Sequence, residues 1–382
     1  MLTVKKFNKI SDVIYTQMAA DKYNFVEDGD NYDVALVRSA ELHDTVFPAE
    51  LLAIARAGAG TNNIPINRCT EQGVVVFNTP GANANAVKEL VICGMLLACR
   101  RIVPGMKWLD KQHAEGATGV DKTMEKAKKD FVGQEIMGKT LGVMGLGAIG
   151  ILVANAAIAL GMNVIGYDPF LNVNAALKLD PAVKLAHDPK DIYAAADFIT
   201  LHLPQNDATK GMINAAVIDT MKPGAVLLNF ARGGLVRDDD VIAALENGKL
   251  GRYVTDFPDD KLLGTENLIA LPHLGASTPE AEENCAFMAA AQLEEYINNG
   301  NIINSVNLPN CSVARPAGTK RAAAIVKGDG AAALQALNGA QQTYTGTRGG
   351  YAYVMADFAD GAQAAAEVLR GIDGVLRVRV IG

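Results

Sequence analysis

A glycine pattern near the middle of the chain constrains its fold more than any other feature. The run Gly145-Leu146-Gly147-Ala148-Ile149-Gly150 follows an apolar stretch typical of a buried strand and opens an apolar stretch typical of a helix. In that setting Gly145 allows a tight turn, Gly147 lets the backbone approach a pyrophosphate, and Gly150 lets helix and strand pack closely. The positive end of the helix dipole lies at the same loop. The pattern therefore predicts a dinucleotide-binding domain.

An acidic residue stands where the next strand is expected to end. Asp168 directly follows the predicted strand 163–167. A carboxylate at this place accepts hydrogen bonds from ribose hydroxyls and repels a 2′-phosphate, so it favours NAD over NADP. A glycine turn without a ligand is the alternative, but it does not explain why glycines, strand, helix and acid coincide.

Composition excludes several other classes of function. The chain has 382 residues and a net charge of −7, and its one lysine-rich stretch, 121–129, also carries acids. We therefore expect no nucleic-acid partner and a solvated surface at that stretch. No apolar run is long enough for a signal peptide or a membrane span, and the five cysteines are spaced for neither zinc nor a disulfide framework. We expect a reduced cytoplasmic protein with no metal site.

Strand-like and helix-like runs alternate along most of the chain, which predicts α/β layers around parallel sheets. After a polar, proline-containing linker at 307–319, a shorter segment has the order βαββαβ. The expected strands are 34–37, 73–78, 140–144, 163–167, 198–203, 225–230, 253–256, 268–271, 321–327, 340–345, 351–358 and 375–380. The expected helices are 48–56, 84–101, 149–160, 192–196, 238–247, 279–299, 331–337 and 361–369.

Three polar side chains follow later strands of the dinucleotide-binding series: Arg232, Asp260 and His273. Ligands collect at the carboxyl edge of such a sheet. An arginine there can grip a substrate carboxylate, a histidine can move a hydroxyl proton, and an acid can orient that histidine. Taken singly, each could be a structural or surface group, and Asp259 is an alternative to Asp260. Together they predict hydride transfer between NAD and a small 2-hydroxy acid.

These residues resemble the D-isomer-specific 2-hydroxyacid dehydrogenase family over nearly the whole chain. The resemblance rests on the glycine pattern and on the motifs Arg38-Ser39, 56–62, 78–80 with Asn83, 201–204, 231–233 and 272–278, while 371–380 is similar to the end of an ACT domain. It implies a discontinuous, flavodoxin-like substrate domain (1–90 and 275–307), a Rossmann-like NAD domain (91–274) and an ACT-like domain (318–382). It also implies a homodimer built through the NAD domain, or a homotetramer.

The resemblance also implies roles for individual residues. The substrate would be 3-phosphoglycerate, oxidised to 3-phosphooxypyruvate in the first step of serine biosynthesis, and two arginines facing it suit a phosphate. Expected at the substrate are Arg38, Ser39, Arg56, Gly58 and Asn83, although the two arginines could instead form surface ion pairs. Expected at NAD are Gly145, Gly147, Ala148, Ile149, Gly150, Asp168, Phe230, Ala231, Asp256, Gly275 and Ala276, with Asp256 at the nicotinamide amide.

The sequence departs from the family at two places. The family has a glutamate where this chain reads Asp259-Asp260-Lys261, and a one-residue deletion aligns Asp260 with it. The serine-sensing His and Asn of related ACT domains are replaced in the turn 326–331, which argues against serine feedback. Two other functions stay open: reduction of glyoxylate, hydroxypyruvate or 2-oxoglutarate, and NAD sensing without catalysis.

Overall fold

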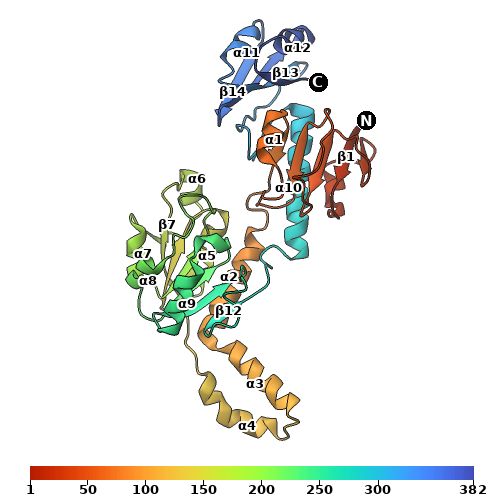
Figure 1. The fold of residues 1–382 in the computed structure, drawn as a ribbon. Helices are drawn as coiled ribbons and strands as arrows, with labels where there is room; N and C mark the ends of the chain where they lie inside the picture. Colours follow the sequence, from red (N-terminus) through yellow and green to blue (C-terminus); the bar gives the residue numbers. More distant parts are fainter. The chain divides into compact units, whose positions relative to one another are not determined.

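The computed structural model describes residues 1–382, which form two compact units. The first unit comprises Met1–Asn83 and Pro279–Gly382, and the second comprises Ala84–Thr278 (Figure 1). Both units contain a parallel sheet, and the first also contains a small antiparallel sheet. The expected fold class, two Rossmann-like parallel-sheet domains followed by a βαββαβ segment, is confirmed. None of the helices combines the length and apolar composition needed to cross a bilayer.

The parallel sheet of the first unit is buried on both faces. Its strand order is β2 (Tyr23–Val26), β1 (Leu2–Lys6), β3 (Val34–Val37), β4 (Ala53–Arg56) and β5 (Val75–Phe77). On one face, alternate strand residues pack against α10 (Pro279–Asn299) and the short helix Asp12–Thr16. On the other face they pack with α1 (Ile66–Glu71). Burial on both faces explains why the inner strand β3 and the strand β5 are apolar throughout rather than alternating.

The helix expected at 48–56 is wrong. Ala53–Arg56 is strand β4, paired on one side with β3 and on the other with β5. Its Ala-Ile-Ala composition does not separate a buried strand from a helix, because a short apolar run fits both. The sheet decides, since a central strand satisfies its backbone N–H and C=O groups on both sides.

The second unit is a doubly wound sheet whose order reverses beside the glycine loop. Its order is β12 (Leu268–Ala270), β11 (Leu250–Thr255), β10 (Ala225–Asn229), β9 (Phe198–Leu201), β6 (Thr140–Met144), β7 (Asn163–Tyr167) and β8 (Lys184–Leu185). Helices α2 (Ala84–Arg100) and α5 (Ala148–Ala159) cover one face. The other face is covered by α7 (Pro189–Ala195), α8 (Ala215–Thr220) and α9 (Asp238–Glu246). The strands are all parallel, but the chain adds β7 and β8 on one side of β6 and β9 to β12 on the other side. Ligands are therefore expected at the carboxyl ends of β6 and β9, where the strand order reverses.

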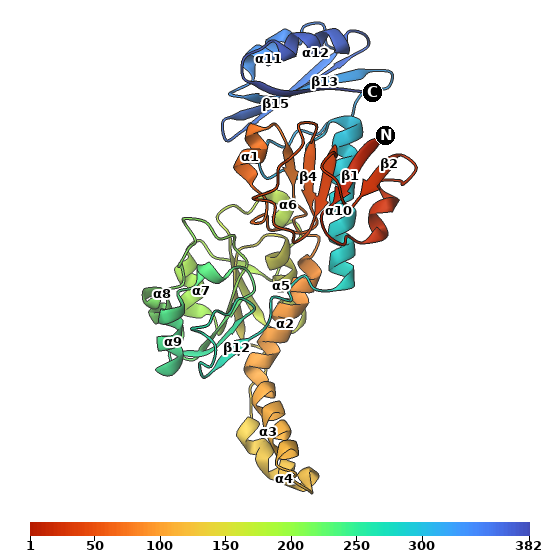
Figure 2. The same cartoon turned by 45° about the vertical axis from the view of Figure 1, so that its right-hand side comes forward.

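A helical hairpin that the sequence analysis did not predict leaves the second unit after α2. It consists of α3 (Ile102–Ala114), α4 (Val120–Ala127) and the turn Lys128–Phe131, none of whose residues is buried. Figures 1 and 2 show it projecting from its own unit. The rings of Trp108 and Phe131 lie 6.1 Å apart and hold its two arms together. The stretch 121–129 lies here, so its predicted exposure is confirmed.

The small antiparallel sheet is also covered on both faces. Its order is β14 (Gln342–Arg348), β15 (Tyr351–Phe358), β13 (Lys320–Lys327) and β16 (Val375–Ile381). One face packs against its own helices, α11 (Ala331–Ala336) and α12 (Ala362–Arg370). The opposite face, including Ala323 and Ile325, shares one core with Leu293 and Tyr296 of α10. The C-terminal segment is therefore part of the first unit (Figure 2).

Arginines of the small sheet bind the last carbonyl groups of α10. Arg379 donates to the carbonyls of Tyr296 and Ile297, each at 2.9 Å, and Arg321 donates to that of Asn299 at 2.6 Å. Cations near a helix C-terminus interact favourably with its dipole, and these satisfy carbonyls that have no partner within the helix. Arg321 is fully buried and forms a two-bond ion pair with the equally buried Asp357, at 2.7 and 2.9 Å.

We expect Asp357→Ala to destabilise the protein by about 3–5 kcal/mol, because it leaves the Arg321 charge buried without its counter-ion. Urea unfolding followed by circular dichroism measures the change. Arg370→Ala is the matched control, since it breaks an exposed ion pair with Glu367 in the same segment and should change stability by less than about 0.5 kcal/mol. Equal effects of the two substitutions would contradict this account of the interface.

Candidate active site

The glycine loop joins β6 to α5 with little room for side chains. Gly145 has φ +93°, and a Cβ there would lie 2.6 Å from the His202 carbonyl oxygen. A Cβ at Gly150 would overlap the Gly145 carbonyl oxygen. At Gly147 nothing lies within 4 Å of a Cβ position, so the backbone faces open space at the start of α5. Because no side chain caps that helix, its first N–H groups remain available for a phosphate.

Asp168 braces this loop from the end of β7. Its carboxylate accepts one hydrogen bond from the Leu146 amide at 2.9 Å and another from the Phe170 amide at 2.8 Å. The side chain is half-buried, so its remaining lone pairs can accept ribose hydroxyls. The residue therefore has a structural task in addition to its expected contact with the cofactor.

His202 lies on the other side of the loop, at the end of β9. Its Nε2 is 3.0 Å from the Thr200 hydroxyl, and its Nδ1 is buried without a partner. Burial lowers the pKa of His202 to about 3, so its imidazole is neutral at physiological pH. It therefore differs from His43, His113 and His187, which are exposed.

Asp256 follows β11 and is the most unusual charged group of the second unit. It is 2% exposed, and neither carboxylate oxygen has a hydrogen-bond partner. Burial raises the pKa of Asp256 to about 6, although its own backbone amide, the Gly275 amide, which lies near the carboxylate outside hydrogen-bond geometry, and Arg232 act in the opposite direction. A Cβ on Gly275 would lie 3.6 Å from its Oδ2, so the carboxylate lies against the 275–276 backbone. An unpartnered buried acceptor fits a ligand that brings N–H donors, as a nicotinamide amide does.

Arg232 and His273 are both exposed and follow two strands, β10 and β12, that lie on either side of β11. Arg232 follows β10, and its Nη1 donates to the Ala231 carbonyl at 2.6 Å. His273 follows β12, and its ring lies 4.5 Å from the ring of Phe257, which follows β11. Parallel pairing of β10, β11 and β12 brings these three loops to one edge of the sheet. The arrangement can hold a carboxylate and move a proton at the same edge as the glycine loop.

The acidic pair has two distinct environments. The Asp259 Oδ1 accepts hydrogen bonds from the amides of Lys261 and Leu262, each at 3.0 Å, so it caps the turn after β11. Asp260 is exposed on that turn. With Asp259 occupied by the turn, Asp260 is the more available of the two acids.

Asn229 is a positioning residue that the sequence analysis missed. It is fully buried at the end of β10, and its Oδ1 accepts from the amides of Ala231 and Arg232 at 3.2 and 3.4 Å. Its Nδ2 donates to the Arg232 carbonyl at 2.9 Å and to the Tyr253 hydroxyl at 3.3 Å. One side chain thus determines the path of the loop that carries Arg232. The available signal was an amide at the end of an apolar strand.

The other predicted cofactor residues differ in exposure. Ala148 is exposed and Ile149 half-buried at the start of α5, and Ala231 is half-buried. Phe230 is buried, and its ring packs so closely on Gly94 of α2 that a Cβ there would lie 2.6 Å away. Only its backbone is available to a ligand.

The residues expected at the substrate lie in the first unit. Arg38 and Ser39 follow β3, where the Asn8 Oδ1 accepts from the amides of Arg38, Ser39 and Ala40 at 2.9–3.1 Å. The Arg38 guanidinium forms an ion pair at 2.6 Å with Glu282 in the first turn of α10. The ion-pair alternative for this arginine is therefore observed.

Arg56 is the last residue of β4, Gly58 follows that strand, and Asn83 lies beyond β5. The Arg56 guanidinium lies against Gly58, where a Cβ would overlap it. The Asn83 Oδ1 is buried without a partner. Burial raises the pKa of Cys285 in α10, while the Thr79 side chain, Arg56 and Arg38 lower it, so both arginines lie near the start of that helix.

Comparison with known proteins gives the family. Residues 92–275 match the family model "D-isomer specific 2-hydroxyacid dehydrogenase, NAD binding domain". The D-3-phosphoglycerate dehydrogenase of Methanocaldococcus jannaschii is 38% identical over 287 residues, which are 73% of this chain and 52% of that protein. The hydroxypyruvate reductase of Thermotoga maritima is 38% identical over 262 residues, covering 65% of this chain and 80% of the reductase.

Solved structures agree on the fold. The NAD⁺-bound 3-phosphoglycerate dehydrogenase of Entamoeba histolytica superposes with a TM-score of 0.64 at 24% identity, covering 80% of this chain and 98% of that one. The chain belongs to the D-isomer specific 2-hydroxyacid dehydrogenases, an enzyme family, and its second unit is an NAD-binding domain. Among named relatives, it is similar to D-3-phosphoglycerate dehydrogenases, although it spans about half the length of those it matches.

We expect Asp256→Asn to stabilise the cofactor-free protein at pH 7.5, by up to about 3 kcal/mol, because the native state no longer holds a buried charge. Because the pKa of Asp256 is raised in the folded protein, burying this carboxyl group costs no stability below about pH 4. The loss of stability grows as the pH rises to about 6 and is constant above it. Thermal melts of both proteins at pH 4.5 and 7.5 measure the difference. A difference that does not shrink at the lower pH would contradict the proposed buried charge.

Proposed function

We propose that the protein oxidises 3-phosphoglycerate to 3-phosphooxypyruvate with NAD, the entry to serine biosynthesis. The similarity to several D-3-phosphoglycerate dehydrogenases, at 34–38% identity, carries the proposal. The proposed substrate has a carboxylate, a 2-hydroxyl and a phosphate. Arg232 and His273 suit the first two, and Arg38 and Arg56 suit the third.

In this proposal the side chains of the second unit carry the proton chemistry. Arg232 holds the substrate carboxylate, and Asn229 keeps the Arg232 loop in place through hydrogen bonds to its backbone. His273 takes the hydroxyl proton, and Asp260 supports the resulting imidazolium. The glycine loop, Asp168 and Asp256 would hold NAD, which supplies the acceptor for the C2 hydride. Closure around the substrate would exclude water during transfer.

Reduction of hydroxypyruvate is the second candidate, and two observations favour it. The chain covers 80% of the hydroxypyruvate reductase of Thermotoga maritima but only 52% of the dehydrogenase of Methanocaldococcus jannaschii. In addition, Glu282 already neutralises Arg38, so a phosphate must compete with that carboxylate for the guanidinium. A substrate without phosphate needs no such exchange.

The proposal extends to the surroundings of the enzyme. We propose that it works in the cytoplasm, as a homodimer or homotetramer, and that its C-terminal segment is an ACT-like domain that aids assembly. The shared core between that segment and α10 supports a structural task for it.

Substrate preference is measured by NADH absorbance, with 3-phosphoglycerate and NAD in one direction and with phosphooxypyruvate or hydroxypyruvate and NADH in the other. We expect the phosphorylated substrates to have the higher kcat/KM. Arg38→Ala and Arg56→Ala should raise KM about tenfold or more for phosphorylated substrates alone, since each removes a charge-assisted contact of about 1.5–3 kcal/mol. Glu282→Gln should lower the same KM, because it frees Arg38. Turnover of hydroxypyruvate alone would select the second candidate.

We expect His273→Ala to lower kcat at least about 100-fold, because positioned acid–base catalysis contributes 10²–10⁴-fold. NADH binding, followed by fluorescence, should remain within about twofold of the wild type, and His113→Ala is the control for loss of an exposed imidazole. Unchanged turnover in His273→Ala would exclude this residue as the general base.

A further inference from the structure

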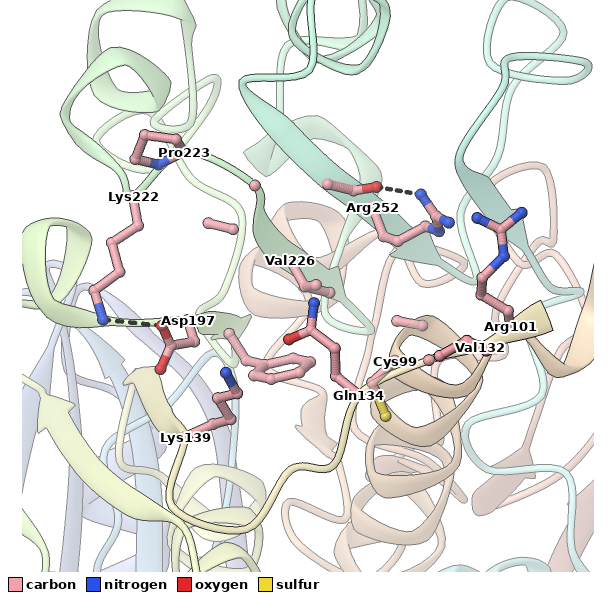
Figure 3. Close-up of a pocket in the computed structure, with 16 residues that line it drawn as sticks. Cys99, Arg101, Val132, Gln134, Lys139, Asp197, Lys222, Pro223, Val226 and Arg252 are labelled. Atoms are coloured by element: carbon pink, nitrogen blue, oxygen red, sulfur yellow. Dashed lines mark hydrogen bonds and ion pairs between the residues drawn. The ribbon is translucent and has the colours of Figure 1, made fainter. Parts of the chain in front are cut away.

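A polar cavity lies in the NAD-binding unit, at the opposite edge of the sheet from the glycine loop. Its volume is about 470 Å³, within the range of small-ligand pockets, and it is lined from the amino ends of β6, β9, β10 and β11. The family's chemistry is placed at the carboxyl edge, so the proposed reaction makes no use of this cavity. Figure 3 shows its lining side chains.

The cavity is cationic although the chain as a whole is acidic. Its lining includes the four cations Arg101, Lys139, Lys222 and Arg252 but only one carboxylate, that of Asp197. That carboxylate is already engaged, because it accepts from Lys222 Nζ at 2.9 Å and from the Thr140 amide at 2.8 Å. Although burial acts the other way, these two groups and the nearby charge of Lys139 lower the pKa of Asp197 below its usual value. Glu266, outside the lining, interacts with the charge of Arg252, but four cations against these two carboxylates still leave the cavity with an excess of positive charge.

The two arginines lie close together. Burial lowers the pKa of Arg252 and the neighbouring charge of Arg101 lowers it further, while the charge of Glu266 acts in the opposite direction. Arg252 is held in place by hydrogen bonds to the Gly251 carbonyl at 2.6 Å and to the Asn267 side chain. Figure 3 shows the guanidinium groups of Arg101 and Arg252 on one side of the cavity, with the Gln134 amide between them and the lysines. Like charges held side by side repel, and an anion bound between them would relieve that repulsion.

Arg101 also has a backbone conformation that is rare for its type. Its φ is +48°, which side-chain-bearing residues adopt at some cost in energy, and such strain collects at ligand sites. The residue stands where the chain leaves α2 for the exposed hairpin, and Gln134 stands where the chain returns. The backbone N–H of Gln134 donates to the Cys99 carbonyl at 2.8 Å, and this hydrogen bond closes the base of the hairpin beside the cavity.

We propose that this cavity binds a small multivalent anion, inorganic phosphate or a phosphate monoester, between Arg101, Arg252 and Lys139. Arginine forks bind phosphate oxygens through two parallel N–H donors, and Lys139 adds a point charge from the other side. Such a ligand would connect the base of the hairpin, residues 101 and 132–134, to the sheet. The inference holds whichever 2-hydroxy acid is the substrate.

Calorimetric titration of the full protein with inorganic phosphate, at constant ionic strength and with saturating NADH, tests the site. We expect saturable binding that Arg101→Ala weakens at least about tenfold, while Arg101→Lys weakens it less because it keeps the charge but loses the fork. Lys139→Ala should weaken it as well. Lys107→Ala, which removes an exposed charge from the same hairpin, is the matched control and should leave the Kd within about twofold.

Amide hydrogen exchange shows which part of the chain the bound phosphate protects. Phosphate should slow exchange of the amides around 99–105 and 131–135, and Arg101→Ala should abolish that protection. Absence of saturable binding, or equal binding by Arg101→Ala, would overturn the proposal. Sedimentation velocity covers a remaining case: if Arg101→Ala dissociates an oligomer while phosphate binding persists, the arginines serve a contact between copies of the chain and the anion site is rejected.

Discussion

Close backbone packing at the glycine loop is the constraint on which the NAD-binding unit depends. Gly150 lies against the Gly145 carbonyl, and Gly145 against that of His202, so β6, α5 and β9 meet without side chains between them. This contact turns the start of α5 toward open space at Gly147 and places Asp168 where it can brace the loop. A methyl group at either Gly145 or Gly150 would separate the elements that create the site.

The first unit depends on a different interaction, the shared core between its two sheets. Alternate residues of β13 pack against α11 and α12 on one face and against α10 on the other. Arginine side chains then satisfy the carbonyl groups at the end of α10, which would otherwise be buried without partners. The start of the same helix supplies Glu282, so α10 connects the C-terminal segment with the predicted phosphate-binding arginines.

Much of this could be predicted from local pattern. Strand β6, the start of α5 and the whole of α10 lie where periodicity, glycines and Pro279 place them. The strand within residues 48–56 could not be predicted in this way, because Ala-Ile-Ala suits a helix as well as a buried strand. Asn229 was missed for a related reason: its importance comes from four hydrogen bonds within its own loop and to Tyr253, and composition does not reveal them.

The sequence by itself determined the dinucleotide-binding fold, the candidate Arg232 and His273, and the family, because these depend on residue types at fixed local spacing. Only the tertiary structure decided that Asp256 is a buried carboxylate without partners, that Glu282 occupies Arg38, and that four cations line one cavity around Asp197. Burial, pairing and net local charge depend on residues distant in the chain. They are therefore defined only once the sheets have brought those residues together.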